Sequence, residues 1–296
     1  MHKPAERAKA TGKALGSCVA ADLNGEPTER AKMLNHLVLG SGKPILMLHG
    51  GRLDHRHMME TLEPVFQSLD GWCRVYVDLP GHGCSPPEAN IRSLDDVLAA
   101  VMAFVETVLG ERCAIIGESR GGYLARGFAQ LRPARVSGVA LIVPARHWAA
   151  DPSRLPAHLV AEPEPTLRSE VANEEVWRFD NFMVVQNRAI LEKTRRCKLP
   201  ALEMCDAEQD ARVAKQFELA HDLQGQAPVF EGPSLIVAGR QDSTTGYLDA
   251  IDLLPQFPRA TIAVLDSAGH GLAWERPELF DALLRDWLVR LARAAG

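Results

Sequence analysis

The sequence predicts an α/β protein with a mostly parallel sheet that helices cover on both faces. Short segments that are apolar at nearly every position recur along the chain and end at glycine, proline or aspartate. Segments whose apolar residues have helical spacing alternate with them. A strand that is apolar throughout is buried on both faces, and this is typical of a parallel sheet. The alternation of the two patterns therefore favours the α/β class.

The predicted strands are apolar runs bounded by turn-forming residues. They lie at residues 44–50, 73–81, 113–117, 138–144, 234–239 and 261–266. Ahead of them, residues 16–27 and 32–42 are interpreted as a pair of strands, whose register the sequence leaves open.

The helices between these strands show capping residues as well as periodicity. Residues 57–69 have helical spacing, and a second helix follows Ser93. Ser93 is expected to cap that helix, with Asp96 in the place of the usual glutamate of a capping box, and Gly110 to end it. A last helix is predicted over residues 277–294.

The alternation stops between about residues 146 and 230. This stretch is rich in proline and charge and contains helical patches, the longest at 173–196. It predicts a helical insertion that lies over the sheet. We therefore divide the chain into a core part at 1–145, in which residues 1–15 are expected to form a flexible tail, the insertion at 146–230, and a second core part at 231–296.

Composition argues against several classes of function. The chain has 296 residues and a net charge of -5, so it lacks the basic footprint of a nucleic-acid-binding protein. No apolar run is long enough to span a bilayer, and the N-terminus does not resemble a secretory signal. Six cysteines lack metal-like spacing, and free thiols are favoured over disulfides in a chain of this size. We expect a cytoplasmic protein with no nucleic-acid or membrane partner; its oligomeric state stays open, a homodimer included.

One stretch carries the chemistry. Residues 113–129 read CAIIGESRGGYLARGFA, in which Gly117, Ser119 and Gly121 form a G-x-S-x-G motif between a strand and a helix. A strand that turns sharply into a helix holds one side chain at its apex in a strained conformation, and the residues two positions away must be small. The motif predicts that Ser119 is a nucleophile.

A serine hydroxyl needs a base, and the base needs an orienting acid. His270 lies between two glycines after the last predicted strand, and Asp242 follows the strand before it. Both come after Ser119 in the chain order of a nucleophile-elbow hydrolase. Asp151 stays an alternative acid. Several other acids and histidines lie near strand ends and also compete for these roles: Asp266, Glu275, His49, His55, His57, His82 and His147.

Acyl chemistry also needs donors for a developing oxyanion. The backbone N–H of Arg120, directly after the nucleophile, is one expected donor. The second is expected from the loop after the first predicted parallel strand, with Gly51 favoured over Arg52. The side chain of Arg120 either pairs with Glu118 or another nearby acid, which we favour, or contacts an acidic substrate.

Five segments together resemble landmarks of the α/β-hydrolase superfamily. They are LHGG at 48–51, VDLPGHGCS at 77–85, GESRGG at 117–122, GRQD at 239–242 and AGHGLAWERPE at 268–278. The resemblance extends from residue 44 to the C-terminus. It implies the α/β-hydrolase fold, with an eight-stranded, mostly parallel sheet and a cap inserted after the sixth strand. It also implies a triad of Ser119, His270 and Asp242, and no metal or organic cofactor.

The cap is similar to that of small esterases, lactonases, cofactor-free haloperoxidases and carbon–carbon bond hydrolases. The last of these usually carry the loop H-G-G-G-P-G, where this chain has Arg52, Leu53 and Asp54. Dehalogenases and epoxide hydrolases of this fold have aspartate at the apex, and Ser119 argues against both. Candidates for the substrate pocket, although the aromatic ones equally suit a cap core, are Arg52, Trp148, Trp177 and Phe182.

These residues predict a serine hydrolase that cleaves a carboxylic ester or a related small acyl substrate through an acyl-enzyme intermediate. One alternative is a carbon–carbon bond hydrolase of the meta-cleavage product type. The other is a homologue that binds a ligand without turning it over.

Overall fold

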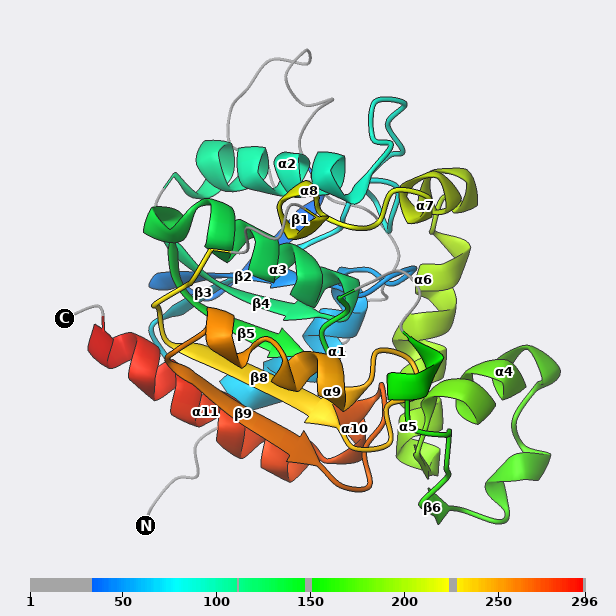
Figure 1. Ribbon diagram of the computed structural model, residues 1–296. Coiled ribbons are helices and arrows are strands. Elements are labelled where there is room, and N and C mark those ends of the chain that lie inside the picture. Colours follow the sequence, from blue (N-terminus) through cyan, green and yellow to red (C-terminus); the bar gives the residue numbers. More distant parts are fainter. Residues whose placement is uncertain (1–33, 111, 147–150, 224–227, 295–296) are drawn as a thin grey trace, which may run out of the picture.

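A computed structural model describes residues 34–110, 112–146, 151–223 and 228–294 (Figure 1). The proposed flexible tail at 1–15 and the predicted strand at 16–27 lie outside these residues. In the part that is described, a central sheet separates two helical layers, and a further group of helices lies beyond one end of the sheet (Figure 1).

The central sheet has seven strands in the order β1-β3-β2-β4-β5-β8-β9. β1 pairs with β3 in the antiparallel sense, and every other pair is parallel. The expectation of eight strands is therefore wrong by one for the described residues. The strands are β1 (His36–Leu39), β2 (Lys43–Leu48), β3 (Trp72–Val77), β4 (Cys113–Glu118), β5 (Val136–Ile142), β8 (Ser234–Gly239) and β9 (Ala260–Leu265).

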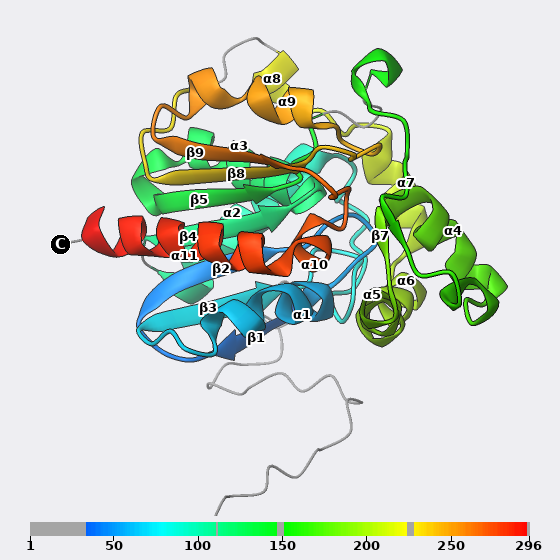
Figure 2. The ribbon, with the colours of Figure 1, turned by 90° about the horizontal axis from the view of Figure 1, so that it is seen from below.

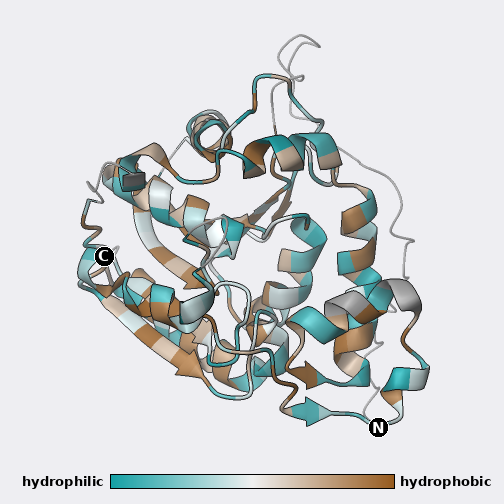
Figure 3. Ribbon diagram, turned by 45° about the vertical axis from the view of Figure 1, so that its right-hand side comes forward, coloured by the Kyte–Doolittle hydropathy of each residue, from teal (hydrophilic) through white to brown (hydrophobic). Residues whose placement is uncertain are grey.

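Helices cover both faces of the sheet (Figure 2). α2 (Leu94–Phe104) and α3 (Arg120–Leu131) lie on one face, and α1 (His55–Phe66) and α11 (Pro277–Ala294) lie on the other. Each face has its own apolar core of buried side chains. Because the inner strands are buried on both sides, most of their residues are apolar, and Figure 3 shows brown, apolar segments along them; Arg74 in β3 and Glu118 at the end of β4 are exceptions.

Local signals bound α2 and α11 where the sequence predicted, whereas α1 spans His55–Phe66 rather than residues 57–69. Ser93 Oγ accepts a hydrogen bond from the backbone N–H of Asp96 at 3.2 Å. The Asp96 carboxylate accepts one in return from the Ser93 N–H at 2.9 Å, so aspartate completes this capping box. After α2 the chain makes a π-helical turn, Val105–Leu109, and Gly110 ends it with a φ of 65°. The last helix has the predicted bounds, Pro277–Ala294.

The segment between β5 and β8 contains helices and a small parallel sheet, and it lies at the carboxyl ends of the main strands (Figures 1 and 2). It follows the fifth described strand of the main sheet rather than a sixth. Its elements are β6 (Glu162–Pro163), α4 (Asn173–Phe182), β7 (Val185–Gln186), α5 (Arg188–Lys193), a π-helical turn (Thr194–Lys198), α6 (Leu199–Glu203), α7 (Ala207–Ala214) and α8 (Ala220–Leu223).

Short elements complete the described chain. α9 (Tyr247–Ile251) follows β8 and α10 (Leu272–Glu275) follows β9. Single 3-10 turns lie at Pro133–Arg135, Pro152–Arg154, Leu167–Ser169 and Leu254–Gln256.

The cysteines only partly follow the expectation of free thiols. Cys73, Cys113, Cys197 and Cys205 are free, and Cys113 is buried in β4. Cys84 is disulfide-bonded, which corrects the expectation at that position. Among the described helices, none has both the length and the apolar character needed to cross a membrane.

Candidate active site

Ser119 lies at the sharp turn from β4 into α3. Its φ of 54° and ψ of -117° are a strained combination for a residue with a side chain. A Cβ on Gly117 would overlap the carbonyl oxygen of Gly121, and a Cβ on Gly121 would overlap the carbonyl oxygen of Leu48. Both motif glycines are therefore required, because backbone approaches backbone on each side of the turn.

Three side chains from three different loops meet at this turn. The Nε2 atom of His270 lies 3.1 Å from Ser119 Oγ, and its Nδ1 atom lies 3.0 Å from a carboxylate oxygen of Asp242. The backbone N–H groups of Thr244 and Thr245 donate to the same carboxylate at 2.8 and 3.1 Å, and the Thr245 hydroxyl donates at 2.8 Å. These three hydrogen bonds hold the Asp242 carboxylate in the orientation in which it contacts the imidazole.

The surroundings of His270 favour the protonated imidazole, and those of Asp242 favour the ionised carboxylate. Burial favours the neutral acid at Asp242, but the charge of His270 and the hydrogen bonds to the carboxylate hold its pKa below the usual value. Burial opposes protonation of His270 in the same way, but the charge and hydrogen bond of Asp242 raise its pKa above 6.5. Asp242 therefore stays ionised and stabilises the imidazolium.

The competing residues are engaged elsewhere. Asp151 is exposed and accepts hydrogen bonds from the N–H and hydroxyl of Ser153 at 2.9 and 2.8 Å. Glu275 accepts from the backbone N–H groups of Gly269 and Val184, both at 2.6 Å, and so joins the His270 loop to the insertion. The carboxylate of Asp266 accepts from Gln241.

The competing histidines that the structure describes also have partners. His49 lies between the Gly50 carbonyl and the Leu79 N–H, and His55 lies 2.8 Å from Asp78. His57 contacts Glu118, and His82 contacts the Pro80 carbonyl. His147 lies outside the described residues.

The loop after β2 lies against the nucleophile. An ideal Cβ on Gly50 would be 3.3 Å from Ser119 Cβ, so this loop passes directly beside the serine. Gly51 follows it, and Arg120 is the first residue of α3. The N-terminus of this helix points unpaired N–H groups and the positive end of its dipole toward the turn. The arrangement places both predicted oxyanion donors near Ser119.

The side chain of Arg120 is buried and reaches the insertion. Its Nη2 atom lies 2.7 Å from a carboxylate oxygen of Asp210 in α7. Its guanidinium also packs against Gly51, where an ideal Cβ would lie 3.1 Å from Nη2. The ion pair thus forms with a nearby acid, as favoured, although the partner is Asp210 rather than Glu118.

Among the described residues, two clusters of side chains have possible ligand atoms close enough together to hold a metal ion. In one, the ligand atoms lie within 4.8 Å of one another: His82, Cys205 and Asp210. The guanidinium of Arg120 already occupies that place beside Asp210, so a cation would meet a positive charge. The other cluster consists of Asp54, His55 and Asp78. Its Asp78 oxygens already accept hydrogen bonds from His55, Asn35 and the Cys84 N–H. Neither cluster suits a metal.

The pocket candidates are only partly brought together. Phe182, at the end of α4, has its ring centroid 5.9 Å from that of His270. Arg52 is exposed on the loop after β2, with a φ of 57°. Trp148 and the side chain of Trp177 lie outside the described part of the chain.

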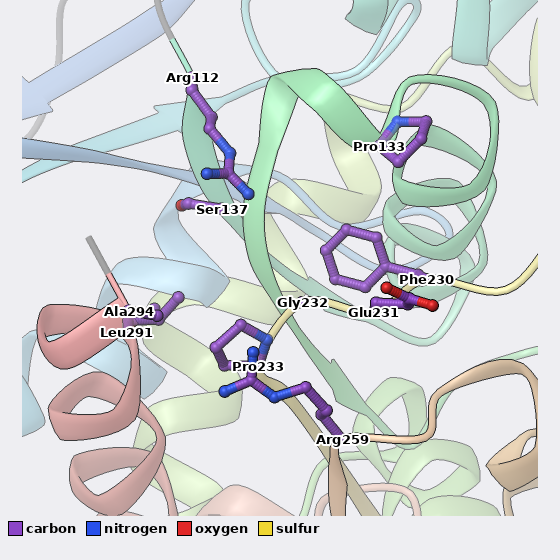
Figure 4. Close-up of a pocket in the computed structure, with 10 residues that line it drawn as sticks. All are labelled: Arg112, Pro133, Ser137, Phe230, Glu231, Gly232, Pro233, Arg259, Leu291 and Ala294. Atoms are coloured by element: carbon purple, nitrogen blue, oxygen red, sulfur yellow. The ribbon is translucent and has the colours of Figure 1, made fainter. Parts of the chain in front are cut away.

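A cavity of about 250 Å³ is lined by none of Ser119, His270 and Asp242; Figure 4 shows its lining residues. Its lining includes Arg112, Ser137, Pro233 and Arg259, which lie at the amino ends of β4, β5, β8 and β9. Ser119 lies at the opposite, carboxyl end of β4. In open α/β sheets ligands bind at the carboxyl ends of the strands, which is the end where Ser119 lies and this cavity does not.

A buried pair that no motif in the sequence indicated lies beside Ser119. His57 Nε2 lies 2.8 Å from each carboxylate oxygen of Glu118, and both side chains are buried. Trp274 lies beside them, with its ring centroid 4.9 Å from that of His57. The charge of Glu118 was visible beside Ser119, but nothing in the sequence indicated which helix faces it.

Comparison with known proteins identifies the family. The Alpha/beta hydrolase family matches residues 45–283. This chain belongs to the Alpha/beta hydrolase family. An alpha/beta superfamily hydrolase from Oenococcus oeni PSU-1 has the same fold, with a TM-score of 0.79 and 25% identity over 89% of this chain and 97% of that one.

Two curated hydrolases show what chemistry such relatives perform. The 2-hydroxy-6-oxononadienedioate/2-hydroxy-6-oxononatrienedioate hydrolase 2 of Pseudomonas putida is 27% identical over 86% of this α/β hydrolase and 91% of its own length. The pimeloyl-[acyl-carrier protein] methyl ester esterase of Neisseria meningitidis serogroup B (strain MC58) is 26% identical over 83% of this chain and 93% of its own. The relatives are hydrolases of different bonds.

Proposed function

We propose that this α/β hydrolase is a serine esterase that cleaves a small carboxylic ester through an acyl-enzyme intermediate. The observation that supports the proposal is the continuous contact from Ser119 Oγ through His270 to Asp242, at 3.1 and 3.0 Å. Nucleophile, base and orienting acid each have a partner within hydrogen-bond reach.

In the proposed reaction, Ser119 Oγ attacks the acyl carbon while His270 Nε2 takes its proton. The N–H groups of Gly51 and Arg120 stabilise the negative charge that develops on the acyl oxygen. His270 then gives the proton to the leaving alkoxide, and the acyl group stays on Ser119. Water, deprotonated by the same imidazole, releases the carboxylic acid. Asp242 keeps the imidazole in the tautomer that presents Nε2 to the serine.

A fluorophosphonate probe tests the nucleophile. We expect one covalent adduct, located on Ser119 by peptide mass spectrometry, and none in Ser119→Ala. A screen of short-chain p-nitrophenyl esters tests turnover. A folded protein that binds the probe at another residue contradicts the proposal, and ligand binding without any turnover favours the non-catalytic homologue.

Carbon–carbon bond cleavage is the second candidate, because one relative is a hydrolase of that type. Against it, Arg52, Leu53 and Asp54 replace the glycine-rich loop expected of such enzymes. Turnover of a meta-cleavage dienoate in preference to every ester would favour this candidate.

A further inference from the structure

Glu118 is held as a buried anion directly behind the nucleophile. It is the last residue of β4, it is 5% exposed, and both its oxygens accept from the Nε2–H of His57. Burial lowers the pKa of His57, which favours the neutral imidazole. Burial opposes ionisation of Glu118, but contact with His57 brings its pKa below the usual value. The pair is thus a carboxylate and a neutral histidine.

Glu118 shares a cavity with His270. The two side chains, with His57, Thr61 and Trp274, line a space of about 10 Å³ behind the triad. Such a volume holds no more than about one water molecule. The Glu118 carboxylate is almost fully buried, so water screens it from the imidazole less than it would at the surface, and the interaction between their charges is stronger.

A cation from the insertion packs on Trp274, which lines the same cavity. Lys198, in the π-helical turn that precedes α6, is 6% exposed, and its Nζ atom lies 4.5 Å from the ring centroid of Trp274. After burial and Asp242, the charge of Glu118 raises the pKa of His270, and that of Lys198 lowers it. The two charges act on the imidazole in opposite directions.

We propose that Glu118 and Lys198 are positioning residues that set the basicity of His270 with charges of opposite sign, one from the core and one from the insertion. The inference rests on the proposed function insofar as His270 is the base. Glu118 adds to Asp242 in stabilising the imidazolium. Lys198 offsets part of that effect, so the imidazole loses its proton at a lower pH.

Other charged groups near His270 do not replace these two. Asp242 contacts His270 Nδ1, and it is unchanged in every variant described below, so its effect on the imidazole is the same in all of them. The carboxylate of Glu275 is engaged by the backbone N–H of Gly269 and of residues in the insertion. His57 is neutral, so it adds no net charge while Glu118 is ionised.

The experiment is an NMR titration of the His270 imidazole in the full chain, with labelled histidine and His270→Gln to assign the signal. Removing the anion with Glu118→Gln should lower the His270 pKa by about one unit. Removing the cation with Lys198→Met should raise it by a similar amount, and the double variant should lie between. Arg196→Met is the matched control, because Arg196 lies on the same helical turn but is exposed and pairs with Glu60.

A lowered His270 pKa in Glu118→Gln together with a raised one in Lys198→Met supports the proposal. Unchanged pKa values in both variants, or shifts of the same sign, overturn it. If Glu118→Gln does not fold, an unchanged or lowered pKa in Lys198→Met is enough to overturn it. The titration needs no substrate, so its result separates from that of the proposed function. If an ester is turned over, the acid limb of kcat/KM should move with the imidazole pKa, which a purely structural role would not cause.

Discussion

At the scale of single residues, the two charges beside Ser119 are paired in different directions. Glu118 faces the buried His57 on α1, and Arg120 reaches Asp210 on α7. Arg120 is neutralised by its partner, and Glu118 is hydrogen-bonded to its own. Both contacts are needed, because burying an unpaired charge costs free energy. The serine between them stays half-buried and in contact with His270.

Asp242, the proposed acid of the triad, gives a prediction at this scale. Asp242→Asn should reduce kcat by about three to four orders of magnitude, because the amide favours the wrong imidazole tautomer and leaves the cation without its charge partner. The fold should survive, since the amide oxygen still accepts from Thr244 and Thr245. Ester turnover and circular dichroism measure the two effects.

Asp151→Asn is the control for this change. It should leave kcat near that of the wild type, because Asp151 is exposed and caps its own short turn. Loss of activity in Asp151→Asn with retention in Asp242→Asn would show that the acid is wrongly assigned.

At the scale of elements, α3 and α7 are joined by a buried ion pair. Arg120 begins α3, whose N-terminus faces the expected oxyanion, and Asp210 lies in α7 of the insertion. The Phe217 ring lies 5.9 Å from the same guanidinium. These contacts connect the insertion to the turn that contains Ser119.

Breaking that pair should be costly. Asp210→Ala leaves the buried Arg120 guanidinium without its counter-charge, so the free energy of unfolding should fall by about 3 kcal/mol. The activity should fall as well, because the start of α3 is no longer held. Urea unfolding and ester turnover measure the two effects.

An exposed pair provides the comparison. Asp286 and Arg290 form an i,i+4 pair on α11, and Asp286→Ala should cost at most about 0.5 kcal/mol. Equal losses of stability in the two variants would contradict the buried role of Asp210.

At the scale of the whole molecule, the loops at the carboxyl ends of β4, β8 and β9 bring Ser119, Asp242 and His270 together. The insertion covers this end, and two separate apolar cores hold the sheet between its helical layers. Asp78, at the end of β3, ties several segments together: it accepts from Asn35, from the N–H and ring of His55, and from the Cys84 N–H.

This junction makes stability depend on acid pH. Burial alone would raise the pKa of Asp78, but the hydrogen bond and charge of His55 help lower it to about 2. A depressed carboxyl pKa stabilises the fold above the unfolded value near 4, and the contribution is lost as the pH falls toward 2. We expect a loss of about 2 kcal/mol over that range from this group.

Urea unfolding at several pH values between 5 and 2 tests this. The wild type should lose more stability over the range than Asp78→Asn, which cannot titrate at this position. Identical slopes in both proteins would show that Asp78 is not the group responsible.

Local patterns in the sequence determined most of the elements of this protein. Apolar runs placed β2 to β5, β8 and β9 within a few residues, because a buried strand must be apolar on both faces. The capping box at Ser93 and the two glycines around Ser119 follow from contacts made within a few residues or from backbone strain, which a short motif records. The family resemblance rests on the same local motifs.

Only the tertiary structure decided which distant charges meet. Asp242 and not Asp151 contacts His270, His57 faces Glu118, and Asp210 receives Arg120. These contacts join segments far apart in the sequence, and their geometry depends on how the insertion packs on the sheet. A charged residue in the sequence does not identify its partner. Burial makes a partner necessary, because an unpaired buried charge is costly, and packing determines which residue is within reach.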